Sequence, residues 1–402
     1  MRHWFHRHIW PLFPYHLRRA VLFGASARLA KRFPAADARL PIIIAGTFGS
    51  ASGLAQSAVL SYRALTQMAV PTFAIDLTAQ LFQPIDSFPM EFVDGVAHRG
   101  PGTVILHINS PLVPLAVLAL GRSVLRQKRI VGCWAWELPQ VPHDWKHGIS
   151  FVHEIWVPST FTANAIRPIA GDVPVRVVPY PVAGKQALAP RTRSATFGRP
   201  FTVLVIFDMA SGFSRKNPLA AIAAFRKAFN EDGSVRLVIK ISRSETFPPG
   251  KRAIDDAVRC SRNIVVIDRL MTHAEIDDLY VESDVLLSLH RAEGFGLTLA
   301  EAMLRGIPVI ATNWSGNADY LSTETGVPVP SVLVPATDPQ RTYHYPGMVW
   351  AEPDIDAAAE ALRLLRNDPV LADRLGRAGA AYAVRHWCSE KYVDIIRGYL
   401  QL

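Results

Sequence analysis

The sequence has few cysteines and no long apolar run. Its three cysteines, Cys133, Cys260 and Cys388, are odd in number and far apart in the chain. Such a set is typical of reduced thiols and not of a disulfide framework. No apolar stretch approaches the roughly 18 residues that cross a bilayer, and no apolar signal segment with a cleavage site is found. We therefore expect a cytoplasmic protein.

Acidic residues are missing from the start of the chain. No Asp or Glu precedes Asp37, whereas basic and aromatic side chains are mixed throughout this segment. Two interpretations of this N-terminal extension, residues 1–39, are open. Its basic side lies on the anionic inner face of the cytoplasmic membrane, or the segment packs on the neighbouring domain. The net charge of +9 calls for an acidic partner, such as nucleic acid, an anionic membrane or a phosphorylated ligand.

The length of 402 residues exceeds the usual size of a single core and predicts two domains. Short apolar runs alternate with helical patterns, which predicts parallel sheets covered by helices. The polar stretch 184–200, which contains proline and glycine, is expected to link a first domain at 40–183 to a second at 201–385. The predicted strands cover residues 40–45, 72–75, 103–108, 129–134, 154–157, 175–178, 201–206, 235–241, 263–267, 284–289 and 307–311.

Residues 284–311 are the most informative stretch. An apolar strand is followed by the glycine turn Gly294-Phe295-Gly296, and from Leu297 apolar residues recur at helical spacing until Gly306. Small residues let a ligand approach the backbone, and the free N–H groups at the start of the new helix point at that ligand. A phosphate group is the ligand that such a turn favours.

Two carboxylates bracket this turn. Glu293 and Glu301 have seven residues between them. Because carboxylates repel phosphate, they are better explained as acceptors for the hydroxyl groups that flank it. A sugar nucleotide carries hydroxyl groups on both sides of its diphosphate. The alternative is an ordinary Rossmann-like strand, turn and helix with two solvated glutamates.

This stretch resembles the E-x7-E signature of the family 4 glycosyltransferases, and residues 312–320 continue the resemblance. The resemblance extends from residue 40 to the C-terminus. It implies the α/β GT-B fold, in which two Rossmann-like domains face a cleft and the last helix, here within 386–402, crosses back to the first domain. It also implies a set of donor-binding residues on the turn, namely Glu293, Gly294, Phe295, Gly296, Leu297, Thr298 and Glu301.

A cationic pair, Arg215 and Lys216, lies just before a predicted helix at 219–229. Arginine forks to two phosphate oxygens, and lysine supplies a point charge. In family 4, an arginine and a lysine on this loop commonly grip the donor diphosphate. Lys216 matches that lysine, whereas the family's arginine usually lies several residues earlier, near Ser211. The resemblance therefore supports Lys216 more directly than Arg215.

The first domain opens with a strand and a second glycine-rich loop, which contains Gly49, Ser50 and Gly53 and leads into a helix. Asp76 follows at the spacing of a ribose-binding acid in dinucleotide sites. A dinucleotide-dependent oxidoreductase is therefore an alternative. Gly46, Gly49 and Gly53 do not fit the G-x-G-x-x-G pattern, which weakens this alternative.

Further candidates follow predicted strands, where ligand crevices of parallel sheets lie. In the first domain they are His107, Asn109, Trp136 and Glu137. A lone histidine at a strand end is commonly structural, but the family context makes His107 a candidate for contacting the sugar or the acceptor. In family 4 the turn after the strand at 263–267 lies against the nucleobase, which makes Asp268 and Arg269 candidates for that contact.

These observations predict a retaining hexosyltransferase that moves a sugar from a UDP- or GDP-sugar to a glycan or lipid-linked acceptor, in cell-surface or exopolysaccharide synthesis. His107, Lys216 and Glu293 are its expected catalytic residues. The resemblance implies no metal or other cofactor, and we expect no nucleic-acid partner. The alternatives are another sugar-nucleotide enzyme of the GT-B fold, such as an epimerase or synthase, the oxidoreductase, and a non-catalytic module that binds membrane surfaces.

Overall fold

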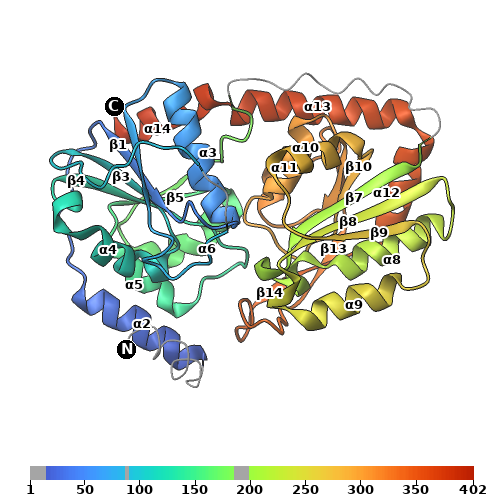
Figure 1. Ribbon diagram of the computed structural model, residues 1–402, viewed down its shortest axis with the longest axis horizontal. Helices are drawn as coiled ribbons and strands as arrows, with labels where there is room; N and C mark the ends of the chain where they lie inside the picture. The colour runs from blue at the N-terminus through green and yellow to red at the C-terminus, as the bar shows by residue number, and fades with distance from the viewer. Residues whose placement is uncertain (1–14, 87–89, 185–198) are drawn as a thin grey trace.

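The structure is a computed structural model that describes residues 15–86, 90–184 and 199–402, with only the backbone of residues 15–21. Residues 1–14 of the predicted N-terminal extension and 185–198 of the predicted linker lie outside the described residues. Two lobes lie side by side, each built on a central sheet with helices around it (Figure 1). The predicted class, two parallel α/β sheets, is confirmed.

The first lobe contains a six-stranded parallel sheet in the order β2-β1-β3-β4-β5-β6. Helices on both faces bury β1 and β3 at every position, which is why these strands are unbroken apolar runs in the sequence. The strands are β1 (Ile42–Gly46), β2 (Thr72–Asp76), β3 (Gly102–His107), β4 (Lys128–Cys133), β5 (Glu154–Val157) and β6 (Val175–Val177). The helices are α2 (Tyr15–Leu29), α3 (Gly53–Gln67), α4 (Val113–Leu125), α5 (Lys146–Ile149) and α6 (Thr160–Ala170).

The second lobe repeats this plan with the strand order β12-β11-β10-β7-β8-β9. Its strands are β7 (Phe201–Asp208), β8 (Val235–Ser242), β9 (Ile264–Asp268), β10 (Val285–Ser288), β11 (Val309–Thr312) and β12 (Val327–Val329). Its helices are α7 (Phe213–Lys216), α8 (Pro218–Phe229), α9 (Pro248–Val258), α10 (His273–Glu282), α11 (Leu297–Leu304) and α12 (Ile355–Asn367). An antiparallel hairpin, β13 (Ser331–Pro335) and β14 (Val349–Pro353), is added to it.

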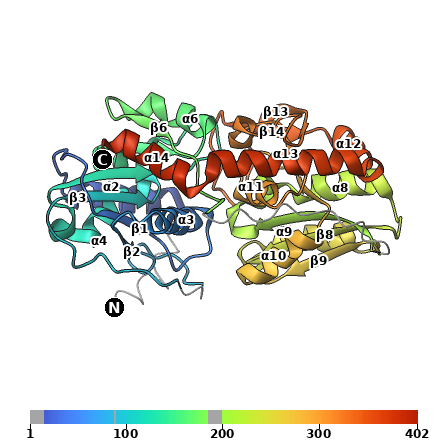
Figure 2. The same ribbon diagram turned by 90° about the horizontal axis from the view of Figure 1, so that it is seen from above.

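Two helices at the end of the chain connect the lobes. Helix α13 (Pro369–Trp387) lies along the second lobe, and α14 (Ser389–Leu400) lies on the first (Figure 2). The Tyr392 hydroxyl donates to the Ser61 hydroxyl of α3 at 2.7 Å, and Ser389 donates to Gln67 Oε1 at 2.9 Å. These bonds attach the C-terminal helix to the first lobe.

The described part of the N-terminal segment packs on the first lobe. The side chain of Phe23 in α2 is buried, Arg32 Nε donates to Ser150 Oγ at 2.9 Å, and the His153 ring is bonded to the Phe33 carbonyl oxygen at 3.0 Å. This packing agrees with the second interpretation of the extension for these residues. Across the described ranges, no helix combines the length and the apolar character needed to cross a membrane.

Candidate functional site

The two lobes enclose a cleft of about 610 Å³ at the C-terminal ends of both sheets. Register brings these ends together: Gly46 at the end of β1 pairs with Asp76 of β2 and with His107 of β3. The predicted site residues that line the cleft are Ser50, Gly53, Asn109 and Glu137 from the first lobe, and Arg215, Lys216, Glu293, Gly294, Phe295, Gly296, Leu297, Thr298 and Glu301 from the second. The structure therefore brings most of the candidates to one place.

The glycine turn between β10 and α11 depends on close backbone contacts. Gly296 precedes α11 with φ of +87°, a conformation that favours glycine. A Cβ at Gly294 would lie 3.2 Å from the Trp136 carbonyl oxygen of the first lobe. A Cβ at Gly316 would lie only 2.1 Å from the Gly294 carbonyl oxygen. Glycine is therefore required at Gly316, and at Gly294 it allows the close approach of the first lobe.

The backbone N–H groups of residues 294–298 form no hydrogen bond to any residue that the structure describes. They stand at the N-terminal end of α11, where the helix dipole is positive. N–H groups in this arrangement form a site for an anion, and phosphate oxygens are the usual guests.

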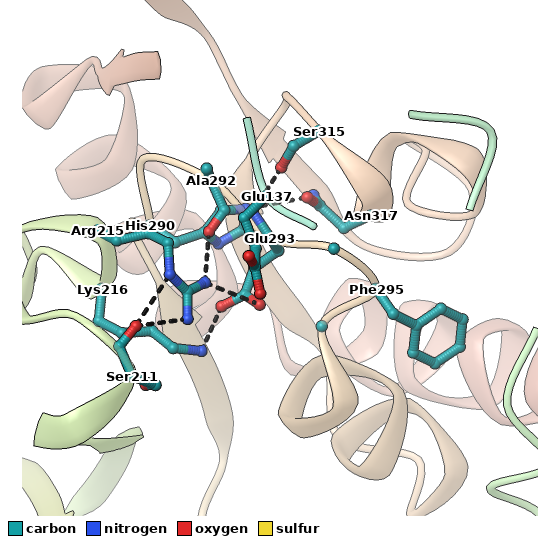
Figure 3. A network of polar contacts seen from close by, with 12 residues as sticks. Glu137, Ser211, Arg215, Lys216, His290, Ala292, Glu293, Phe295, Ser315 and Asn317 are labelled. Atoms are coloured by element: carbon teal, nitrogen blue, oxygen red, sulfur yellow. Dashed lines mark hydrogen bonds and ion pairs between the residues drawn. The ribbon is translucent and has the colours of Figure 1, made fainter. Parts of the chain in front are cut away.

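Glu293 lies beside this turn and is held by two cations (Figure 3). Lys216 forms an ion pair with its carboxylate, and Arg215 Nη1 lies 3.3 Å from Glu293 Oε2. Arg215 also donates to the carbonyl oxygens of Ala292 at 2.7 Å and of Ser211 at 2.8 Å. Most N–H groups of Arg215 are thus used within the protein, so this arginine supports Glu293. Glu293 is the hydrogen-bond partner of the Lys216 ammonium group among the described residues, and Lys216 lines the cleft.

Burial and charge act in opposite directions on this cluster. Burial alone would raise the pKa of Glu293, but Lys216 and Arg215 outweigh it and hold that pKa at about 2. Burial lowers the pKa of Lys216, and the carboxylate of Glu293 offsets part of that effect. At neutral pH the carboxylate is therefore ionised.

Glu301 lies on α11 and is partly buried. The Tyr280 hydroxyl donates to Glu301 Oε2 at 3.0 Å, and burial raises the pKa of this carboxyl group.

The nucleobase candidates, Asp268 and Arg269, do not line the cleft. Asp268 accepts from Ser244 Oγ at 2.7 Å, and Arg269 pairs with Glu275 at 2.7 Å. The four residues that follow, 270–273, line the cleft instead.

The first glycine loop meets the cleft through Ser50 and Gly53. Gly49 does not line the cleft, and its N–H donates to Thr78 Oγ1 at 3.0 Å. Asp76 accepts from the Thr78 N–H at 3.0 Å and does not line the cleft. The acid that the oxidoreductase alternative needs beside a ribose is therefore engaged elsewhere.

His107 and Trp136 lie in the core and do not line the cleft. His107 is 1% exposed, its Nδ1 lies 2.8 Å from Ser57 Oγ, and burial lowers its pKa to about 3. Trp136 donates from Nε1 to the Gln140 carbonyl oxygen at 2.7 Å. Of the four candidates at the strand ends of the first lobe, Asn109 and Glu137 line the cleft, whereas His107 and Trp136 do not.

Two residues that the sequence analysis missed cross between the lobes. The Tyr343 hydroxyl donates to Glu137 Oε2 at 3.1 Å, and its ring lies 5.3 Å from the guanidinium of Arg215. Arg243 donates to the Ala51 carbonyl oxygen at 2.8 Å and to the Asp208 carboxylate. A cluster of two tyrosines at 343 and 345 was the only local signal for Tyr343, and Arg243 had none.

The residues just before Glu293 are held in place by contacts within the second lobe. His290 is buried with its Nε2 2.9 Å from Asn317 Oδ1, which ties the motif to residues 316–319. Arg291 binds Glu352 through two nitrogens, at 2.6 and 3.0 Å, and so joins the motif to β14. No group of three or more metal-ligating side chains is found among the residues that the structure describes.

A family model described as "Family 4 Glycosyltransferase in conflict systems" matches residues 160–380, more than half of the chain. This match includes the glycine turn, both glutamates and the Arg215-Lys216 pair. The comparison with curated proteins gave no significant match.

Solved structures with the same fold include glycosyltransferases of several kinds. Sucrose-phosphate synthase from Thermosynechococcus elongatus is 15% identical with a TM-score of 0.65, and the match covers 90% of this chain and 99% of that one. HepE from Anabaena in complex with UDP is 13% identical with a TM-score of 0.61, over 90% and 100% of the two chains. TarM from S. aureus is 14% identical with a TM-score of 0.56, and the match covers 75% of this chain and only 55% of TarM. These matches confirm the GT-B fold.

Proposed function

Because the chain belongs to the family 4 glycosyltransferases, we propose that it transfers a sugar, with retention of the anomeric configuration, from a nucleoside diphosphate donor to a glycan or lipid-linked acceptor. The observation that carries this proposal is the set of N–H groups at residues 294–298 without partners among the described residues, which line the same cleft as Lys216. Two of the similar structures, HepE and TarM, contain UDP, which favours a UDP-sugar among the possible donors.

The donor diphosphate would bind at the glycine turn. The N–H groups of residues 294–298 and the ammonium group of Lys216 lie where negative charge develops as the nucleoside diphosphate leaves. Preorganised donors around a developing charge are usually the largest single contribution to catalysis. We assign this role to the turn and Lys216, with Arg215 acting through Glu293.

The two glutamates would accept hydrogen bonds from the sugar units on either side of the diphosphate. Glu293 is ionised and would accept from the hydroxyl groups of the transferred sugar. Glu301, deeper on α11, would accept from the ribose, and residues 270–273 would contact the base. Holding the anomeric carbon against the acceptor in this way lowers the activation barrier, by up to about 7 to 11 kcal/mol in well-oriented reactions.

The acceptor would approach from the first lobe. Glu137 and Asn109 line that wall of the cleft, and the Asn109 side-chain oxygen is fixed by the Ala135 N–H at 2.8 Å. Both groups suit hydroxyl-rich acceptors. A role in cell-surface or exopolysaccharide synthesis follows if the acceptor is a lipid-linked glycan at the membrane surface.

The experiment is a thermal-shift screen with UDP-, GDP- and ADP-sugars, followed by a transfer assay with the donor that binds. A donor that binds only the folded state raises the melting temperature with its concentration. We expect stabilisation by one nucleotide class and release of its diphosphate in the presence of an acceptor. An epimerase would return an isomerised donor without release of diphosphate. Vesicle binding without turnover of any donor would support the non-catalytic module and overturn the proposal.

A further inference from the structure

The carbonyl oxygens of the glycine turn are all engaged by partners. The Glu293 carbonyl oxygen accepts from the Gly316 N–H at 2.8 Å, and that of Phe295 accepts from the Tyr320 hydroxyl at 2.6 Å. The Gly294 carbonyl oxygen accepts from the Ser159 hydroxyl at 2.6 Å. Because a trans peptide is planar, a C=O fixed on one side directs the next N–H to the other. These bonds therefore determine where the free N–H groups of the turn point.

Ser159 is the one of these three donors that comes from the first lobe. It is fully buried and does not line the cleft. The Gly294 carbonyl thus points to the buried Ser159, and the Phe295 N–H of the same planar peptide group points away from it. This N–H has no partner among the described residues, and Phe295 lines the cleft. Thr162 Oγ1 lies 3.5 Å from this carbonyl oxygen, but its closer acceptor is the Trp136 carbonyl oxygen at 2.9 Å.

The start of α6 is a docking point between the lobes. Ser159 is the N-cap of α6, and its hydroxyl accepts from the Thr162 N–H at 3.2 Å. The next residue, Thr160, donates its N–H to Asp319 Oδ2 of the second lobe at 2.7 Å. The ring of Phe161 lies 5.0 Å from that of Trp314, at an angle of 67°. Three successive residues therefore contact the second lobe, and Ser159 contacts the donor turn itself.

We propose that Ser159 is a positioning residue for the donor diphosphate, an inference that rests on the proposed function. When the lobes are closed, its hydroxyl fixes the Gly294–Phe295 peptide group so that the Phe295 N–H faces the phosphate. When they are open, this carbonyl loses its donor and the peptide group is free to rotate. The first lobe thereby completes the anion site of the second, and binding of diphosphate favours the closed state by its differential affinity.

The test compares Ser159→Gly with Ser159→Thr and with a matched control. Glycine at an N-cap costs only a few tenths of a kcal/mol, so Ser159→Gly removes the hydroxyl while largely preserving α6. Asp354→Gly makes the corresponding change at the N-cap of α12, outside the cleft. Titration calorimetry measures the affinity of each protein for UDP, GDP and ADP and for the free nucleosides.

Loss of one hydrogen bond predicts a roughly tenfold weaker affinity of Ser159→Gly for the diphosphate. The affinity for the matching nucleoside should stay the same, Ser159→Thr should recover most of the diphosphate affinity, and Asp354→Gly should behave as wild type. A purely structural role would lower the nucleoside and diphosphate affinities together, and that result would overturn the proposal. Equal diphosphate binding by wild type and Ser159→Gly would also overturn it and would leave the proposed function standing.

If no diphosphate binds the wild type, the proposed function fails and this inference fails with it. If Ser159→Gly does not fold, Asp319→Ala provides the second test, since it changes an exposed residue and removes the acceptor of the Thr160 N–H. The expected result is a roughly threefold loss of diphosphate affinity without a change in nucleoside affinity. The loss is expected because α6, and with it Ser159, is held less firmly against the second lobe. Unchanged affinity for both ligands would count against the proposal.

Discussion

Replacing Glu293 with glutamine removes the carboxylate that the site is built around while preserving its shape. The side chains of Glu293, Lys216 and Arg215 are 8%, 14% and 4% exposed, so solvent screens their interactions little. The pKa of Glu293 is lowered from 4.5 to about 2, which corresponds to about 3 kcal/mol of folding free energy at neutral pH. Removal of one partner of a buried ion pair costs about the same, 3 to 5 kcal/mol.

Glu293→Gln should therefore lower the free energy of unfolding by about 3 kcal/mol. The assay is guanidinium unfolding of both proteins at several pH values. A folded-state pKa below the unfolded value means that the contribution is fully present above about pH 4.5 and is lost as the pH falls toward 2. The comparison is made from pH 6 downward, where titration of Lys216 contributes least. The difference between the proteins should be constant from pH 6 to pH 5 and shrink below that. A difference under about 1 kcal/mol at pH 6, or one that does not shrink between pH 4.5 and pH 2, would refute the reasoning.

The same substitution should make diphosphate binding depend on pH. Burial already lowers the pKa of Lys216, and loss of the neighbouring carboxylate lowers it further. As the pH is raised toward the ordinary pKa of lysine, the affinity of Glu293→Gln for UDP should fall at a lower pH than that of the wild type, because its lysine loses its charge earlier. Glu154→Gln is the matched control, since the buried Glu154 pairs with Arg129 and Arg176 outside the cleft and its loss should leave UDP affinity unchanged.

Three further substitutions test other parts of the site. Lys216→Met should lower the rate of transfer by about 100-fold or more, whereas Lys251→Met, at an exposed pair with Asp255, should not change it; equal rates would contradict the role of Lys216. Gly316→Ala should prevent folding or donor binding because its Cβ would lie 2.1 Å from the Gly294 carbonyl oxygen, and Gly233→Ala, with open space around it, should do neither. Arg243→Gln should raise the radius of gyration of the free protein in X-ray scattering and raise the donor KM several-fold, because Arg243 contacts Ala51 across the lobes; an unchanged radius would argue against its role in closure.

Much of the sheet architecture could be predicted from the sequence because its strands are buried on both faces. The prediction for β5, 154–157, coincides with the observed strand, and those for β7 and β8 stop only one or two residues short. The hairpin β13–β14 was missed for a physical reason. Val332 and Leu333 are adjacent and both exposed, so β13 has no alternation of buried and exposed residues that a pattern could reveal.

One part of the candidate site could also be predicted from the sequence, and another part could not. Residues 293–301 form one continuous turn and helix, so their spacing in the sequence already contains their arrangement in space. The bonds from Ser159 to Gly294 and from Tyr343 to Glu137 join residues 135 and 206 positions apart. No local pattern contains such contacts, since they depend on how the two lobes close. His107 illustrates the converse: its place at a strand end was predictable, but its burial under α3 was not.

The position of Arg215 explains why one carboxylate has two cations. In the proposed function, a bound diphosphate would share the ammonium group of Lys216 with Glu293. A buried carboxylate left without a partner would be costly. Arg215 stays with Glu293 because its remaining bonds, to the backbone at Ser211 and Ala292, hold the guanidinium in place. We infer that this departure from the family's usual arginine position leaves Lys216 available to the donor while Glu293 remains ionised and paired.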